Sequence, residues 1–167
     1  MHWPRFAVLV LIATLLQKSW LNTIAVTDLR VTPDLLLIAM VFFAVRCSEK
    51  EAIISSFVLG FAADIAATGF SIGPLIISFG LFGTGLSYLH RLISIKKVPH
   101  QAITIFVVGL GTAILAWLLA RVAVQTPKPG GFIALIGTSI YSAVLGPVLF
   151  LFLDWLMPIK NRRRGRK

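Results

Sequence analysis

The sequence predicts an all-α protein, a polytopic membrane bundle of about six transmembrane helices. Its composition is the first reason: 57% of the 167 residues are hydrophobic, against 16 Lys and Arg and 6 Asp and Glu. Average soluble domains have about twice this charged fraction, and no soluble fold of this size could bury so much apolar surface. The second reason is that the apolar residues form six runs separated by short polar segments. Lipid is therefore expected to cover much of the chain.

Each run is expected to form one helix. The runs are residues 6–21, 35–45, 52–67, 73–89, 102–124 and 132–157. A helix rises about 1.5 Å per residue and the hydrocarbon core is about 30 Å thick, so the last two runs span it comfortably. The third and fourth runs span only with local thinning of the bilayer or with loop residues that complete the crossing. The first follows a basic residue, as in a secretory signal, but no small-x-small cleavage site comes after it, so we expect a retained helix.

The second run is too short to cross the bilayer alone, because its residues give roughly 16 Å of helix. The preceding "TDLRVTPD" is expected to complete the crossing as irregular backbone packed against protein, where such backbone is tolerated. Gly146 and Pro147 lie inside the sixth run and are expected to kink it.

The basic residues indicate the orientation. With six spans and both termini in the cytoplasm, only four Lys and Arg fall on the outer side: Lys18, Arg30, Arg121 and Lys128. This asymmetry follows the positive-inside rule. We therefore expect one membrane domain over residues 1–159 and a basic cytoplasmic tail over residues 160–167. The net charge of +10 is distributed as a topology signal, which argues against a nucleic-acid partner.

The tail "KNRRRGRK" follows directly after the last apolar run. Basic residues there are expected to bind anionic lipid at about 1 kcal/mol each, with docking to an acidic cytoplasmic partner as the alternative. The residues concerned are Arg162, Arg163, Arg164, Arg166 and Lys167.

Asp64 is the main candidate for a special role, because it lies inside an apolar run. Ala52, Ser56, Gly60 and Asp64 are spaced by four residues and share one small, polar helix face, which lets membrane helices approach closely. Asp64 is then a proton, ligand or partner site, or it accepts hydrogen bonds from the backbone of the following "ATGFSIG" turn. No second acid or histidine is expected at comparable depth.

The segment "VTPDLLLIAM" predicts a sharp helix start. Thr32 is the cap with Pro33 at the first helical position, or Asp34 is the cap. The functional interpretation is a rigid outer edge for a partner, and plain capping is the alternative. Glycines in the fourth and fifth runs predict close helix packing within the chain, or between copies in a homo-oligomer.

The sequence shows no catalytic arrangement, no cofactor motif and no metal site. The single Cys47 excludes an intramolecular disulfide and a cysteine-rich metal site, and the histidines are not spaced with acids as metal ligands are. Asp154 is expected to be a charge partner of Lys160 and the arginines that follow. The protein is therefore expected not to be an enzyme.

Four segments in this order and spacing resemble the rod shape-determining MreD family. They are a Pro-Asp-Leu-Leu start at residues 33–36, a polar hairpin at 46–51, a Gly-apolar-x-x-Asp segment at 60–64, and a Gly-rich turn at 69–73 that leads into the fourth helix. Chain length, helix number and the short basic C-terminus fit as well. Within these segments the resemblance adds Gly69 and Gly73 to the structural or partner candidates.

The resemblance implies a multi-pass protein of the bacterial inner membrane in the rod-shape, or elongation, complex. It implies a partner like MreC, a single-span periplasmic protein, and proximity to MreB and the lateral-wall synthases. It also implies a fold similar to the S components of energy-coupling-factor transporters. No chemistry is known to be required of the family, so a non-enzymatic scaffold that helps to maintain cell shape is expected.

The second hypothesis is such an S component, binding a small molecule in a pocket open to the outside. Its basis is the same count of six helices with short loops and an intramembrane acid. The polar residues of the outer half are few for such a pocket. A proton-coupled carrier rests on Asp64 alone.

Overall fold

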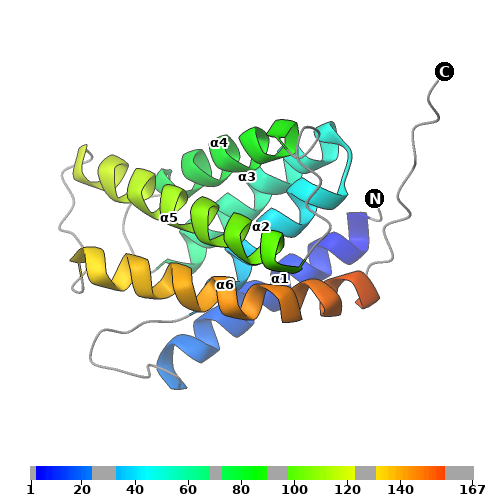
Figure 1. The fold of residues 1–167 in the computed structure, drawn as a ribbon, viewed down its shortest axis with the longest axis horizontal. Coiled ribbons are helices and arrows are strands. Elements are labelled where there is room, and N and C mark those ends of the chain that lie inside the picture. The colour runs from blue at the N-terminus through cyan, green and yellow to red at the C-terminus, as the bar shows by residue number, and fades with distance from the viewer. Residues whose placement is uncertain (1–2, 24–32, 68–72, 90–97, 123–130, 157–167) are drawn as a thin grey trace.

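The computed structural model describes residues 3–23, 33–67, 73–89, 98–122 and 131–156, and within them the chain is helical (Figure 1). The six helices are α1 (Trp3–Thr23), α2 (Leu35–Arg46), α3 (Glu49–Ala66), α4 (Pro74–Leu89), α5 (Val98–Val122) and α6 (Gly131–Leu156). Every predicted run forms one of them. The largest differences are at the starts of α1, α3 and α5, which extend into polar residues before the run.

Helix α2 is the centre of the bundle. It contacts each of the other five helices, and all ten residues from Leu36 to Val45 are buried. A helix that is apolar on every side needs such a place, because it has no polar face to turn outward. This explains why the shortest run is tolerated: the ends of α2 meet protein, so α2 does not have to reach both membrane surfaces. The segment expected to complete its crossing lies mostly outside the described residues.

Aromatic rings join α1, α2 and α6 at one end of the core. Phe6 of α1 meets Phe43 of α2 edge-on, with ring centroids 5.0 Å apart. Phe42 contacts Phe43 and, on the other side, Phe150 of α6, with centroids 5.4 and 5.2 Å apart. Edge-to-face rings contribute about 0.5–1.5 kcal/mol per pair beyond burial. These ring contacts therefore hold both α1 and α6 against α2.

The turn between α2 and α3 is short because both helix ends are capped within a few residues. Glu51 of the first turn of α3 accepts hydrogen bonds from the N–H of Ser48 at 3.3 Å and from its hydroxyl at 2.8 Å. This reciprocal contact stabilises a helix start. The N–H of Cys47 bonds the carbonyl of Phe43 and ends α2. The antiparallel hairpin predicted for this turn is therefore present.

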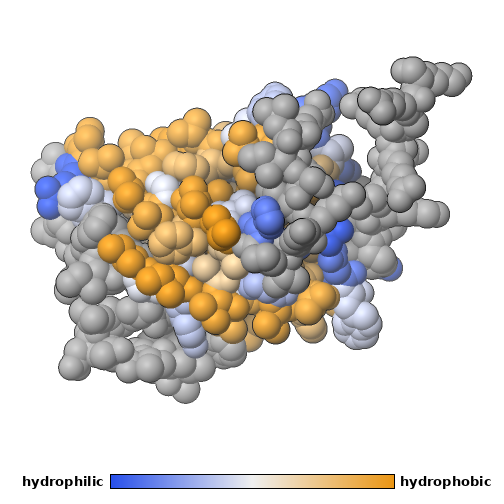
Figure 2. Space-filling model, in the orientation of Figure 1, coloured by the Kyte–Doolittle hydropathy of each residue, from blue (hydrophilic) through white to orange (hydrophobic). Residues whose placement is uncertain are grey.

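The outer surface of the bundle is apolar. Figure 2 shows the face formed in front by α5 and α6, where hydrophobic side chains cover the middle and hydrophilic ones gather toward the two ends. Exposed side chains on α6 include Val144, Val148 and Leu151. By length and composition, His100–Val122 and Ile136–Leu156 are two helices able to cross a membrane. The crossing of the bilayer by all six helices stays a prediction.

We expect the Cys47 thiol to react slowly with maleimide. Burial, with a smaller contribution from the Glu51 carboxylate, raises the pKa of this thiol to about 12. At about pH 8 roughly one thiol in 10⁴ is then ionised, against about a quarter for an unperturbed cysteine. A cysteine placed at the exposed neighbour, Lys50→Cys with Cys47→Ser, should label at least about 100-fold faster.

The measurement is the initial rate of labelling by a membrane-impermeant maleimide on opened membranes. Because the raised pKa keeps the thiol neutral, the rate for Cys47 should increase about tenfold per pH unit up to that value. Equal rates at the two positions would contradict the raised pKa. The Lys50→Cys variant also tests the topology, since it should label only after the cytoplasmic side is opened.

Candidate functional site

Asp64 lies near the end of α3 and holds the beginning of α4. Its carboxylate is buried, with 4% of the residue exposed. Oδ2 accepts hydrogen bonds from the N–H groups of Gly73 and Ile76 at 2.9 and 3.0 Å, and Oδ1 accepts one from Leu75 at 3.2 Å. Leu75 and Ile76 lie in the first turn of α4, where N–H groups have no partner within the helix, and Gly73 directly precedes it. The partial positive charge of a helix N-terminus also favours a carboxylate there.

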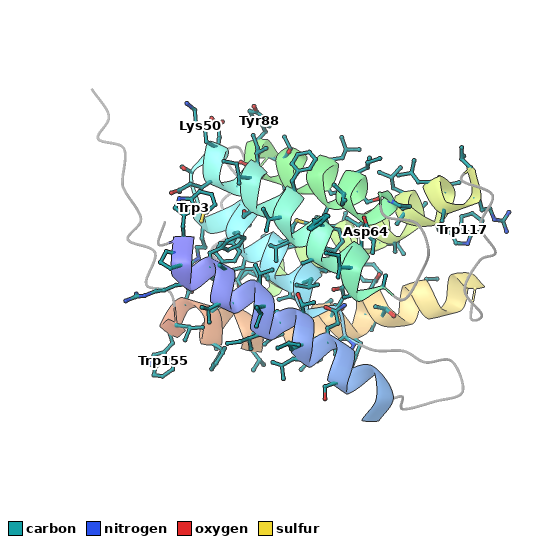
Figure 3. All side chains as sticks on the ribbon, turned by 180° about the vertical axis from the view of Figure 1, so that it is seen from behind. Trp3, Lys50, Asp64, Tyr88, Trp117 and Trp155 are labelled. Atoms are coloured by element: carbon teal, nitrogen blue, oxygen red, sulfur yellow. The ribbon has the colours of Figure 1, made fainter. Side chains whose placement is uncertain are left out.

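These hydrogen bonds explain why an aspartate is tolerated inside an apolar run. A carboxylate that accepts several N–H bonds is well satisfied even when it is buried. Asp64 was interpreted either as a proton, ligand or partner site or as an acceptor for the backbone of the following turn. The hydrogen bonds in the structure are those of the second interpretation, although Leu75 and Ile76 lie just past that turn. Figure 3 shows Asp64 between the two ends of the bundle, Trp3 and Lys50 lying at one end and Trp117 at the other.

Gly73 provides the backbone geometry that this contact needs. Its φ angle is +145°, a conformation that residues with a side chain rarely adopt. The N–H of Gly73 points to Asp64 Oδ2, and its carbonyl accepts a bond from the N–H of Ile77 at 3.0 Å. Gly73 therefore bonds to both helices: its N–H bonds to Asp64 of α3, and its carbonyl accepts a bond from the first turn of α4. Gly69, the other glycine of this turn, lies outside the described residues.

Helices α3 and α4 approach closely along the predicted small-residue face. A Cβ added at Gly60 would lie 2.9 Å from Cα of Ile76 and from the carbonyl oxygen of Leu75. At the next crossing point, a Cβ at Gly83 would lie 2.0 Å from the hydroxyl of Ser56. Ser56 is fully buried and donates its hydroxyl hydrogen to the carbonyl of Ala52 at 2.7 Å. Small residues on both helices thus permit the contact.

We call Ser56, Gly60, Asp64, Gly73 and Gly83 the α3–α4 clamp. The other close glycine contacts of the described residues also lie within the chain: Gly80 faces Phe57, Gly111 faces Phe82, Gly109 faces Leu37, and Gly146 faces Ile105. Gly85 has nothing within 4 Å of an added Cβ. The structure thus assigns most of these glycines to packing within the chain.

Asp34 is a second junction, which joins three helices. It is the N-cap of α2, and its Oδ1 accepts a hydrogen bond from the N–H of Leu37 at 3.0 Å. The same oxygen accepts a bond from Nε2 of Gln17 in α1 at 3.2 Å. Its own N–H donates to the hydroxyl of Ser142 in α6 at 2.9 Å. Of the two caps considered, Asp34 is the one used, and the buried Pro33 precedes the helix instead of beginning it.

The expectation of no second acid at comparable depth was wrong. Measured from the same turn, Asp34 lies about 18 Å along α2 and Asp64 about 22 Å along α3, which is a difference of about one helical turn. The sequence did not show this because α2 was expected to be completed by additional chain. The two acids make separate sets of hydrogen bonds.

Asp154 forms an ion pair with Arg46, at the ends of α6 and α2 that are opposite Asp34. The expected partners, Lys160 and the following arginines, lie outside the described residues, as do the tail candidates Arg162, Arg163, Arg164, Arg166 and Lys167. Sequence reasoning missed Arg46 because it lies 108 positions away in the chain. Both side chains are partly exposed, so the pair orients the helix ends more than it stabilises them.

Gln17 and Ser142 are the members of these junctions that sequence reasoning did not single out, whereas Gly83 was expected, with the other glycines of its run, to pack closely. Gln17 and Ser142 are polar residues inside apolar runs, and that signal was available. Nothing in the sequence indicated which polar residues meet. Among the described residues, no group of three or more His, Cys, Asp or Glu is placed to hold a metal ion.

Comparison with known proteins gives one clear relation. The family model described as rod shape-determining protein MreD matches residues 1–158. No curated protein and no solved structure matches the chain, so the expected likeness to S components has no support from a known fold. The match covers nearly the whole chain and includes both the α3–α4 clamp and the Asp34 junction. The chain belongs to the rod shape-determining MreD family, and its role is in rod shape determination.

Proposed function

We propose that this protein is a non-enzymatic scaffold of the bacterial elongation complex that docks an MreC-like single-span protein and helps to position lateral peptidoglycan synthesis. The observation that carries the proposal is the use made of the two acids inside the bundle. Asp64 and Asp34 both accept hydrogen bonds from helix N-termini of their own chain. Their carboxylates thereby fix helix positions, which is what a scaffold requires.

The placement in the membrane is part of the proposal. Six helices would cross the inner membrane, with residues 1–159 as the membrane domain and both termini in the cytoplasm. Figure 3 shows Trp3 and Trp155 at the same end of the bundle together with Lys50 and Tyr88, as expected if this end lies at one membrane interface. Tryptophan and tyrosine are enriched at membrane interfaces. The basic tail would bind anionic lipid there, near MreB and the wall synthases.

Docking of a partner would use the rigid outer ends of α2, α3 and α4. The α3–α4 clamp would hold the ends of α3 and α4 together, and the Asp34 junction would hold the end of α2 against α1 and α6, so a partner would meet a preformed surface. A preformed surface lowers the entropy lost on binding. A loss of either junction would weaken docking without touching a reaction centre.

The test is recovery of the partner from native membranes by a tagged copy of this chain. Cells that depend on the variant Asp64→Leu or Pro33→Ala should round up, and less of the single-span partner should be recovered per copy of scaffold. Gly85→Ala is the matched control, because an added Cβ meets nothing there. The amount of each variant in the membrane is measured alongside. Wild-type shape and recovery for both variants would remove the proposed site.

A further inference from the structure

Helix α1 is attached to the bundle unevenly along its length. In its first half Phe6 and Leu9 are buried, and Phe6 contacts the ring of Phe43. Large apolar side chains that face outward occur in both halves: Val8, Leu11 and Ile12 in the first and Leu15 and Leu16 in the second are each 44–61% exposed. Among the side chains that the structure describes, the buried ones of α1 therefore lie in its first half.

A groove lies between α1 and α3, which also contact each other directly. Its volume is about 620 Å³, and the side chains that line it include Ala7, Val10 and Leu11 on α1 and Val58, Phe61 and Ala62 on α3. Thr14 also borders it, but its hydroxyl bonds the carbonyl of Val10 at 2.7 Å. Figure 3 shows α1 running alongside α3 and crossing α6 obliquely. The groove thus leaves room beside α1 on the side of α3.

Gln17 connects the second half of α1 to Asp34, and the two polar atoms of its side chain have opposite effects on stability. Its Nε2 donates a hydrogen bond to the carboxylate of Asp34 at 3.2 Å. Its Oε1 is buried and, within the described residues, has no hydrogen-bond partner. The bond to the carboxyl group of Asp34 stabilises this position, whereas a buried oxygen without a donor costs about 1–3 kcal/mol. The two effects are of similar size.

We propose that α1 is a movable helix that pivots near Phe6, with the Gln17–Asp34 hydrogen bond as the latch that holds its second half in the position seen. Release of the latch lets α1 tilt toward α3 and narrow the groove. The helix rise of about 1.5 Å per residue puts Gln17 roughly 16 Å from the pivot, so a tilt of about 10° moves it by about 3 Å. Closer helix packing and the release of lipid chains favour that movement.

On this proposal the second half of α1 is the movable part of the protein, and α3 with α4 is the fixed part. Helices α3 and α4 are joined through backbone contacts at Gly60 and through the three bonds of Asp64. The second half of α1 has large exposed side chains and a groove beside it. A partner that reaches the membrane face of the protein can then change the position of α1 while the α3–α4 clamp stays as it is.

The test measures two spin-label distances in the full chain, reconstituted in vesicles of phosphatidylethanolamine and phosphatidylglycerol, with Cys47→Ser. The first pair, Leu16→Cys with Leu81→Cys, reports α1 against α4. The second pair, Val148→Cys with Leu81→Cys, reports α6 against α4. All three labelled positions are exposed and lie outside the groove lining. Each pair is measured with the native residue at position 17 and with Gln17→Leu.

We expect Gln17→Leu to shift the first distance by about 3 Å, or to add a second population, and to leave the second distance unchanged. Thr14→Val is the matched control one turn away, because its hydroxyl bonds only a carbonyl of α1 in the bonds seen here; it should change neither distance. An unchanged first distance in Gln17→Leu overturns the proposal. If both distances change, the Gln17→Leu variant has lost its fold. Gln17→Asn, whose side chain is too short to reach Asp34, is then measured instead. A shift of the first distance alone supports the proposal, and an unchanged first distance overturns it.

Discussion

Replacing Asp64 with leucine is expected to lower the free energy of unfolding by about 3 kcal/mol or more. The substitution leaves the N–H groups of Gly73, Leu75 and Ile76 without their acceptor. Each buried donor left unpaired costs about 1–3 kcal/mol, and movement of the α4 end recovers part of that cost. Among the described residues, few single side chains serve as many backbone groups as Asp64 does.

The free energy is measured by unfolding the purified protein in mixed micelles with increasing dodecyl sulfate. Asp64→Asn should fall between leucine and wild type, because the amide keeps one acceptor oxygen and places an NH₂ group against the remaining donors. Ile65→Leu is the control on the adjacent, half-exposed position and should be within about 0.5 kcal/mol of wild type. A leucine variant as stable as this control would show that the three bonds contribute nothing net.

Replacing Gly60 with alanine is expected to destabilise the protein by about 1–3 kcal/mol, the usual cost of inserting a methyl group into a well-packed site. The added Cβ would lie 2.9 Å from backbone atoms of Leu75 and Ile76. Backbone cannot rotate away as a side chain can, so α3 and α4 must separate. The better helix propensity of alanine offsets at most about 1 kcal/mol.

Gly85→Ala is the matched control for this prediction. It makes the same chemical change on α4 at a position with nothing within 4 Å of the new Cβ, so it should be neutral or slightly stabilising. Both variants are compared in the same dodecyl sulfate titration. If Gly60→Ala were as stable as Gly85→Ala, the close approach of α3 and α4 would not be a feature of the folded protein in solution.

The two substitutions act on the same part of α4, so their effects should not add. Asp64 bonds the N–H groups of Leu75 and Ile76, and Gly60 faces the backbone of the same two residues. A helix already displaced by Gly60→Ala has partly lost the bonds that Asp64→Leu removes. The double variant should therefore be more stable than the sum of the single effects predicts, with a difference of about 0.5–3 kcal/mol.

The sequence by itself determined the number, order and approximate bounds of the helices. Apolar runs in lipid must satisfy their backbone groups internally, so a run of sufficient length becomes a helix whatever its neighbours are. The four-residue spacing of Ser56, Gly60 and Asp64 also fixed which face of α3 is small and polar, because that spacing is a property of any helix. The family resemblance followed from the same segments, and the family match over residues 1–158 agrees with it.

Only the tertiary structure decided which side chains meet. The pairing of Arg46 with Asp154 and of Asp34 with Ser142 joins positions 108 residues apart, and no local pattern carries that information. The same holds for α2: its apolar sequence showed that it must be surrounded, but lipid and protein satisfy that need equally well. In the structure the other five helices surround α2, so protein covers it. The same packing brings Gln17 and Asp34 together.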